Sequence, residues 1–181
     1  YAGDNTIAIR VYDVVHGGGI IEGNLGIYRA KKNRLLLDLQ GVWSFGTSWF
    51  GKPIKEASEW VDIIVPGPWE HQGFPKYDGF AWYKRTFTFP ENLVSDDLVL
   101  LLGKIDDFDK VYLNGQLIGS TNDHRPYGSS ESYSRTRVYD IPVKALKQKG
   151  SNTLEILVED MGNIGGIYEG PVGITTRTDY E

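Results

Sequence analysis

The sequence contains no cysteine among its 181 residues and only one methionine. The absence of cysteine excludes a disulfide framework, a cysteine-ligated metal site and a cysteine nucleophile. Long apolar runs are also missing, because the longest, at 35–37 and 98–102, fall far short of the ~20 residues that a membrane-spanning helix needs. We therefore expect no membrane partner.

Basic residues are outnumbered: 19 Lys and Arg stand against 24 Asp and Glu, a net charge of −5. Binding to nucleic acid requires a clustered basic surface, so we expect no nucleic-acid partner. The sequence starts at Tyr1 without a methionine or a leader pattern, and we expect a fragment of a longer protein.

Glycine and aromatic residues are abundant, with 22 glycines and 13% Phe, Trp and Tyr. Aromatic and β-branched residues favour strands, and glycine favours turns. Short strands are predicted at 35–39, 42–45, 61–65, 80–89, 98–102, 110–113, 116–120, 137–141, 152–160 and 172–175. A single short helix is predicted at 142–150, where Pro142 would start it and Gly150 would end it. The fold class is therefore all-β, with a jelly-roll β-sandwich as the best architecture.

Alternation within the predicted strands assigns their faces. In the strand at 80–89, Tyr83 and Phe87 share one face, whereas Trp82 and Lys84 share the other. The residues expected in the core are Phe87, Phe89, Val111, Leu113, Leu154, Ile156 and Val158.

The sequence repeats itself at an offset of 147 residues, because residues 3–28 and 150–175 are identical at 13 positions without a gap. We interpret residues 1–30 as the C-terminal tail of a preceding copy of the same fold. Residues 31–34 would be a linker, and residues 35–177 a complete domain. A strand at 5–13 lacks the neighbours of its own copy, and we expect it to pair outside that copy, as in a dimer.

Four segments carry a resemblance to a known family. They are VPGPWEHQGFPKYDGFAWYKRTFTFPE (65–91), LGKIDDFDKVYLNGQLIGST (102–121), RVYDIP (137–142) and LKQKGSNTLEILVED (146–160). In this order they resemble the galactose-binding-like jelly roll, the sugar-binding domain of family 2 glycoside hydrolases. A similar module is inserted in bacterial sialate O-acetylesterases. The resemblance covers residues 35–177 and implies a secreted or periplasmic carbohydrate-active parent enzyme.

The same resemblance implies that catalysis takes place in another domain. Family 2 hydrolases use two carboxylates on a separate barrel, and the esterase serine also lies elsewhere. The chain contains no Gly-x-Ser-x-Gly and no His-x-x-x-His motif. We expect a non-catalytic carbohydrate-binding or accessory module, whose partners are a glycan or the parent's catalytic domain. The alternatives are an esterase accessory domain and a structural spacer without a ligand.

Aromatic and polar residues on expected loops and outer faces are candidates for binding a sugar, because aromatic rings pack on sugar rings while polar groups hold hydroxyls. The candidates are Trp49, Trp69, His71, Trp82, His124, Arg125 and Tyr127. The alternative for Trp69 is a plug at the end of the sandwich with its N–H bonded to backbone. The alternative for Trp49 and Trp82 is burial in one of the two packed faces of the sandwich. The alternative for the loop residues is a solvated loop.

Asp106, Asp107 and Asp109 form an acidic group beside a predicted strand. Several carboxylate oxygens would suit a structural calcium ion, and they would also suit sugar hydroxyls. The alternative is that these residues solvate the start of the strand and bind loop amides. No other cofactor is expected, since Gly165-Gly166 has no phosphate-binding spacing and fits a tight loop between two strands.

Overall fold

The computed structural model describes residues 9, 35–53, 59–95, 97–122 and 131–181. The chain divides into two units, residues 1–31 and 32–181, and Ile9 is the described residue of the first. The expectations for residues 1–30, for the linker at 31–34 and for a strand at 5–13 lie outside the described residues. The paragraphs that follow concern the second unit by itself.

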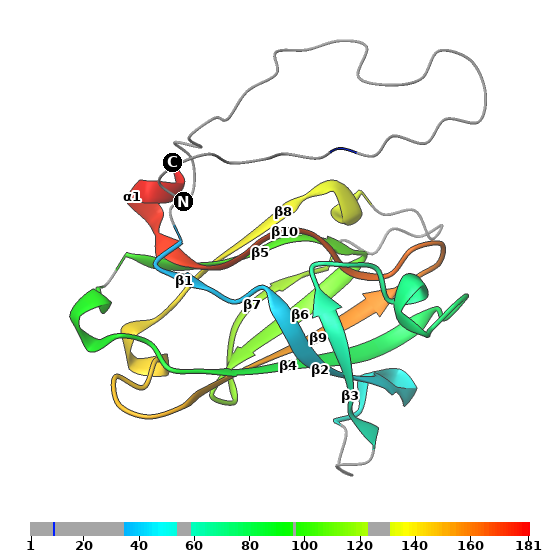
Figure 1. Cartoon of the computed structure of the whole chain (residues 1–181), viewed down its shortest axis with the longest axis horizontal. Coiled ribbons are helices and arrows are strands. Elements are labelled where there is room, and N and C mark those ends of the chain that lie inside the picture. The colour runs from blue at the N-terminus through cyan, green and yellow to red at the C-terminus, as the bar shows by residue number, and fades with distance from the viewer. Residues whose placement is uncertain (1–8, 10–34, 54–58, 96, 123–130) are drawn as a thin grey trace. The chain divides into compact units, whose positions relative to one another are not determined.

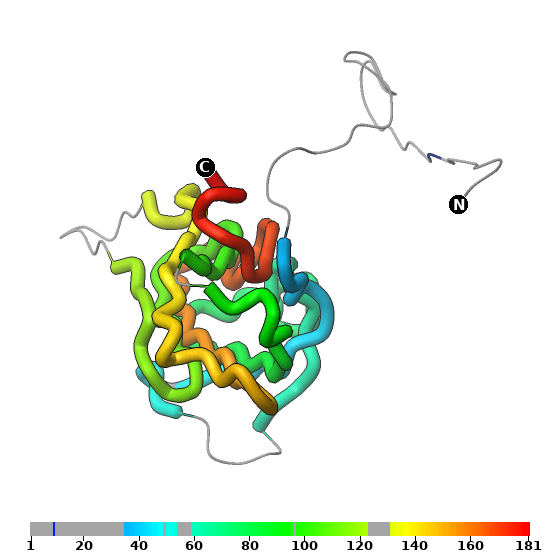
Figure 2. Tube along the Cα trace, turned by 90° about the vertical axis from the view of Figure 1, so that its left-hand side faces the viewer, coloured from blue at the N-terminus to red at the C-terminus, as the bar shows by residue number. Residues whose placement is uncertain are grey.

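Two antiparallel sheets face each other in this unit (Figures 1 and 2). The four-stranded sheet has the order β1 (Leu37–Asp38), β10 (Gly166–Thr176), β5 (Leu98–Asp106) and β8 (Thr136–Asp140). The six-stranded sheet has the order β3 (Val61–Val65), β2 (Gly41–Ser48), β4 (Gly79–Phe87), β9 (Asn152–Asp160), β6 (Phe108–Leu113) and β7 (Gln116–Thr121). The prediction of an all-β sandwich is confirmed.

Helical structure in the described residues is limited to short turns. They are η1 (Trp49–Gly51), η3 (Trp69–Gln72), η4 (Glu91–Leu93), η5 (Ser132–Ser134), η6 (Val143–Ala145) and the one-turn helix α1 (Arg177–Tyr180). None of the helices that this part of the chain forms is long and apolar enough to cross a membrane.

The helix predicted at 142–150 is wrong, because only the 3₁₀ turn η6 forms there. Its backbone bonds run from Ala145 to Pro142 and from Leu146 to Val143. Beyond this turn, the Asn152 side chain accepts a bond from the Lys147 N–H at 2.8 Å and donates to the Lys147 carbonyl at 3.0 Å. The side chain thereby takes the backbone groups that a continuing helix would use.

The core lies between the two sheets and follows the predicted alternation. All seven residues expected in the core are buried: Phe87, Phe89, Val111, Leu113, Leu154, Ile156 and Val158. On β4, Tyr83 points into the core, and Trp82 lies half-buried on the outer face of the six-stranded sheet. The assignment of faces on this strand is confirmed.

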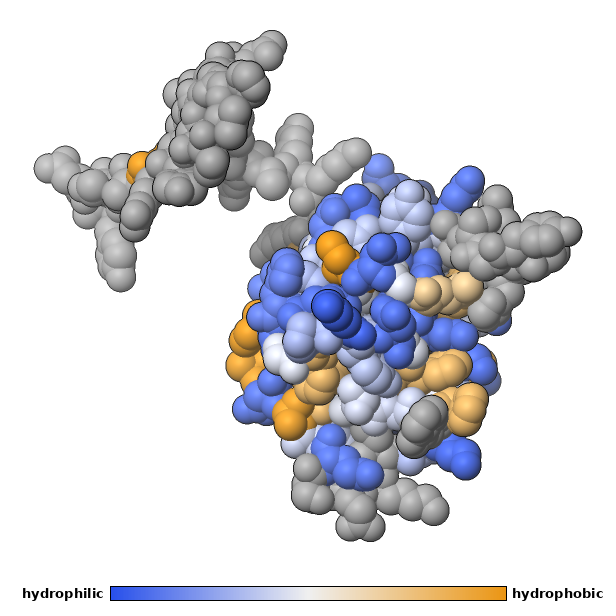
Figure 3. All heavy atoms as spheres, turned by 90° about the vertical axis from the view of Figure 1, so that its right-hand side faces the viewer, coloured by the Kyte–Doolittle hydropathy of each residue, from blue (hydrophilic) through white to orange (hydrophobic). Residues whose placement is uncertain are grey.

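Strands β4, β5, β6, β9 and β10 end or begin at the same end of the sandwich. Gly79 pairs with Asp160, Phe108 with Glu159 and Gly166 with Asp106. The connections at 66–78, at Asp107 and at 161–165 therefore converge there, at the right of Figure 1. We call this region the loop end; viewed face-on in Figure 3, its surface is largely hydrophilic with scattered apolar side chains.

Candidate functional site

Three carboxylates meet at the loop end because β5 and β9 both end there and β6 begins there. Asp106 is the last residue of β5, Asp160 is the last residue of β9, and Asp107 joins β5 to β6. One oxygen atom from each of the three lies within 4.8 Å of the others. Two of these residues, Asp107 and Asp160, are buried.

Backbone N–H groups hold two of these side chains in place. The Oδ2 atom of Asp107 accepts a bond from the Met161 N–H, and the Oδ1 atom of Asp160 accepts one from the Gly162 N–H, both at 3.0 Å. The second oxygen of Asp160 is buried without a hydrogen-bond partner among the described residues. The cluster is therefore a rigid, anionic part of the domain whose hydrogen-bonding capacity is not fully used.

Burial and mutual repulsion shift the titration of this cluster. Burial, the hydrogen bond with Asp107 and the charges of Asp107 and Asp160 raise the pKa of Asp106 to about 8, although the charge of Arg137 opposes the shift. Burial is also the main cause that raises the pKa of Asp160 to about 6, against the lowering effect of the Gly162 N–H. At neutral pH the cluster retains a proton that free carboxyl groups would lose.

These raised pKa values predict that the domain becomes less stable as the pH rises. A carboxyl group whose pKa is raised on folding stabilises the fold fully below its ordinary value and loses that contribution as the pH passes its folded value. We expect the melting temperature to fall between about pH 4 and pH 8, and Asp106→Asn to raise it at the upper end while changing little at the lower end. Thermal melts across this range measure the effect.

The control is Asp62→Asn, because Asp62 is an exposed carboxylate on β3. This change should leave the pH dependence intact. An Asp106→Asn variant that loses the same stability at every pH would contradict the prediction and indicate that the carboxylate is a required hydrogen-bond acceptor.

The three aspartates could hold a hard cation such as calcium, which takes several oxygen ligands. The set differs from the predicted one, in which Asp109 was the third member. Asp109 does not lie in this group, because it is 3% exposed and forms an internal ion pair with Arg137. Asp160, 51 positions further along the chain, takes its place.

Asp109 belongs instead to a buried network around Arg137. The Arg137 Nε atom donates to Asp109 at 2.7 Å, and the Tyr139 hydroxyl donates to the second oxygen of the same carboxylate. The guanidinium also donates to the carbonyls of Ile105 and Asp107 at 2.9 and 2.6 Å, and to those of Ser132 and Arg135. Arg137 thus binds together the segments that lead into and out of the acidic cluster.

Trp69 is not a sugar platform, because its side chain is 0% exposed and packs against Phe45. Its indole N–H donates to the Tyr77 carbonyl at 3.0 Å, as in the alternative of a plug with a satisfied N–H. A Cβ atom added at Gly165 would lie 2.1 Å from the indole, so the glycine is needed for close packing. His71, two residues further on in η3, is exposed.

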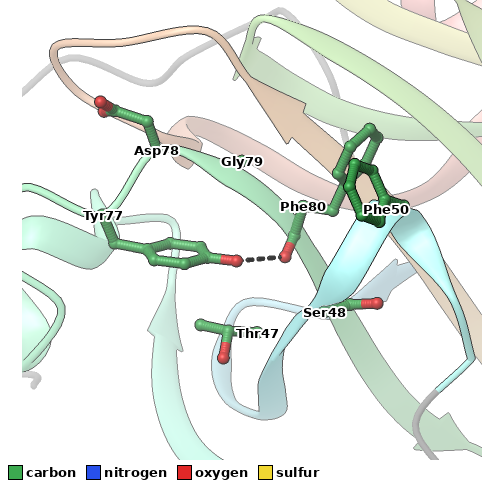
Figure 4. Close-up of a pocket in the computed structure, with 7 residues that line it drawn as sticks. All are labelled: Thr47, Ser48, Phe50, Tyr77, Asp78, Gly79 and Phe80. Atoms are coloured by element: carbon green, nitrogen blue, oxygen red, sulfur yellow. Dashed lines mark hydrogen bonds between the residues drawn. The ribbon is translucent and has the colours of Figure 1, made fainter.

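A hollow of about 390 Å³ opens at the loop end (Figure 4), and Gly79 in its lining pairs with Asp160. Its aromatic walls are Tyr77 on one side and Phe50 and Phe80 on the other. The Tyr77 hydroxyl donates to the Phe80 carbonyl at 2.7 Å, and the Ser48 hydroxyl donates to the Lys52 carbonyl. The Asp78 carboxylate points away from the rings in Figure 4. The polar groups that line this hollow are therefore largely committed to the protein itself.

A second hollow, of about 210 Å³, lies on the outer face of the six-stranded sheet. It is lined by Pro53, Trp60, Trp82, Tyr112, Gly115 and Glu155. Of the sugar-binding candidates, Trp82 is the described side chain that lines one of these two hollows. The Trp49 side chain and the loop residues His124, Arg125 and Tyr127 lie outside the described residues.

The sequence analysis did not select Trp60, Tyr112, Asp160 or Arg137 as site residues. Period-two alternation could have identified Tyr112, because it predicts that Tyr112 faces away from the buried Val111 and Leu113. The signal for Arg137 was a charged residue at an inward position of a predicted strand. Nothing local marks Trp60 or Asp160, because their neighbours in space come from distant segments.

Comparison with known proteins identifies the family to which this domain belongs. The family model described as "Beta-galactosidase second all-beta domain" matches residues 56–164. A putative beta-glucuronidase from Formosa agariphila is 30% identical over 151 residues, which cover 74% of this chain and 13% of that protein. The beta-glucuronidase of Canis lupus familiaris is 26% identical over 117 residues, which cover 54% of this chain and 18% of that protein.

Solved structures agree in fold. The beta-glucuronidase of Bifidobacterium dentium, in complex with coumarin-3-O-glucuronide, has a TM-score of 0.53 and 27% identity over 68% of this chain and 20% of that chain. The beta-glucuronidase of Bacteroides uniformis has a TM-score of 0.57 and 21% identity, over 73% of this chain and 16% of that chain. This chain therefore spans a fifth or less of the length of these relatives. It belongs to the family of the second all-β domain of beta-galactosidases, a domain of family 2 glycoside hydrolases.

Proposed function

We propose that this chain is a non-catalytic accessory domain of a glycoside hydrolase related to beta-glucuronidases. The relatives named above are glycoside hydrolases, and the chain corresponds to a small part of each. These relatives give no support to the alternative that the parent enzyme is an esterase. The parent's substrate would then be a glycoside, and its catalytic groups would lie outside this domain.

The observation that carries the proposal is the setting of the loop-end carboxylates. A retaining glycosidase needs two carboxylates about 5–5.5 Å apart that can both reach a sugar. Asp107 and Asp160 are close enough to Asp106, but they are 8% and 3% exposed, and each accepts a bond from a backbone N–H. Neither the hollow at Tyr77 nor the hollow at Trp82 is lined by any of the three. Carboxylates in this setting support loops rather than chemistry.

An activity assay of the chain tests this proposal. We expect no turnover of 4-nitrophenyl β-D-glucuronide or 4-nitrophenyl β-D-galactoside above the rate in buffer. An active beta-glucuronidase in the same assay confirms that the substrates and conditions are adequate. Turnover that disappears in an Asp160→Asn variant of the chain would overturn the proposal, because it would place a catalytic carboxylate inside this domain.

A spacer that binds no ligand is the second candidate function. The rigid packing of the loop end favours it, because Arg137, Trp69, Asp107 and Asp160 are each hydrogen-bonded to backbone groups. Titration with sugars separates the two candidates, since a spacer gives no saturable signal.

A further inference from the structure

The hollow on the outer face of the six-stranded sheet is formed by side chains from three separate segments. Trp82 of β4 and Tyr112 of β6 stand on either side of Glu155 of β9, since Glu155 pairs with Lys84 on one side and Tyr112 on the other. The Trp82 and Tyr112 rings are 5.8 Å apart, inclined at 37°. Trp60 and Pro53 complete the lining, and Gly115 leaves room where a side chain would stand.

The aromatic walls of this hollow are held in position before any ligand arrives. The Trp82 N–H donates to the Lys52 carbonyl at 3.0 Å, which fixes the orientation of the indole. The Lys84 ammonium lies 5.6 Å from the centre of the Trp60 ring and 3.8 Å from the Glu155 carboxylate. Binding here therefore requires little ordering of these side chains, which lowers one of the free-energy costs of association.

The lining indicates the chemistry of the ligand. Indole and phenol rings offer apolar surface, and the Glu155 carboxylate offers hydrogen-bond acceptors. The Tyr112 hydroxyl can donate or accept a hydrogen bond. A ring with apolar C–H faces and many hydroxyl groups matches this mixture. At about 210 Å³, the hollow has the volume of roughly seven waters at ~30 Å³ each, which suits one pyranose ring.

The charge of the side chains around the hollow narrows the class of ligand further. Among the described residues that line the hollow, the charged one is Glu155, a carboxylate. This carboxylate repels an anionic sugar more than a neutral one, although the Lys84 ammonium, 3.8 Å away, offsets part of that repulsion. An aromatic site with a carboxylate also attracts cations, but Lys84 already supplies a cation to both Trp60 and Glu155. A neutral sugar is therefore favoured over a uronate and over an organic cation.

The position of the hollow disfavours an added strand as the occupant. It lies over β4, β9 and β6, which are interior strands of the sheet with both edges paired. Strand addition needs the free backbone groups of an edge strand. The edge strands of the six-stranded sheet are β3 and β7.

We propose that this hollow binds a neutral pyranose ring of a glycan, with Trp82 and Tyr112 as walls and Glu155 and the Tyr112 hydroxyl as hydrogen-bonding groups. The proposal rests on the accessory role proposed above and adds a binding site to it. Turnover by the chain would overturn the accessory role, whereas absence of binding at Trp82 would overturn this site alone.

Titration of the whole chain tests the site, with tryptophan fluorescence and calorimetry as readouts. The probes are lactose, methyl β-D-galactopyranoside and methyl β-D-glucopyranoside, with methyl β-D-glucuronide and choline for comparison. We expect at least one neutral probe to bind with a Kd in the millimolar range and more tightly than methyl β-D-glucuronide. Trp82→Ala should weaken binding about tenfold or more, as expected for loss of an aromatic anchor. Tyr112→Phe, which removes only a hydroxyl group, should weaken it less.

Two further variants make the test specific. Glu155→Gln removes the negative charge and should narrow the gap between the neutral sugar and methyl β-D-glucuronide. Val143→Ala, an exposed change in η6 outside both hollows, should leave affinity unchanged. The proposal is overturned if no neutral probe binds, if binding survives both Trp82→Ala and Tyr112→Phe, or if choline binds more tightly than the sugars. It is also overturned if Trp82→Ala dissociates a dimer, because the face would then be occupied by a second copy of the chain.

Discussion

Replacing Arg137 by methionine is expected to lower the free energy of unfolding by about 3–5 kcal/mol. The reason is that Arg137 and Asp109 are 2% and 3% exposed and paired with each other at 2.7 Å. Removal of the guanidinium leaves the Asp109 carboxylate buried without its cation. It also leaves the carbonyls of Ile105 and Asp107 without their donor. Chemical denaturation at neutral pH measures the loss.

Two control variants separate a buried charge from the loss of a side chain. The double variant Arg137→Met/Asp109→Leu should recover part of the stability, because no unpaired charge remains and the Tyr139 hydroxyl keeps its bond with Thr121 at 2.7 Å. Arg177→Met breaks an exposed ion pair, because the side chains of Arg177 and Asp140 are 42% and 78% exposed. This variant should hardly change the melting temperature. Equal losses from Arg137→Met and the double variant would contradict this account.

Replacing Gly103 by alanine is the second change with a large expected effect. Gly103 lies in the middle of β5, where the pairing with β8 is shifted, and its φ is +58°. A Cβ atom here would lie 1.7 Å from the Glu169 carbonyl oxygen and 2.7 Å from its carbon atom. The left-handed conformation costs about 1–2 kcal/mol, and the displacement of β10 should add about 1–3 kcal/mol. Denaturation of the purified variant measures the sum.

Gly115→Ala is the matched control. Gly115 also has a positive φ, +80°, but nothing lies within 4 Å of the added Cβ atom. This variant should show only the conformational cost, so the difference between the two measures the clash with the Glu169 backbone. If both variants lost the same stability, close approach of β10 to β5 would not be the reason for the glycine.

Local patterns in the sequence were enough to predict the fold. The alternation at 80–89 and 152–160 assigns every second side chain to the core, because successive residues of a strand point to opposite faces. The Asn114-Gly115 pair predicts a hairpin between β6 and β7, and both residues have the positive φ of 51° and 80° that this tight turn requires. Each signal is contained within a few adjacent residues.

Only the tertiary structure decided which residues form sites. Asp106, Asp107 and Asp109 are adjacent in sequence, yet Asp109 pairs with Arg137, and Asp160 arrives from another strand. Trp69 and Trp82 are both sugar-binding candidates from the sequence, but one fills the core and the other lines a surface hollow. The reason is physical: a strand's own alternation sets the face of a side chain, whereas its neighbours depend on which strands pair and in which register. That pairing is determined by packing between segments that lie far apart in the chain.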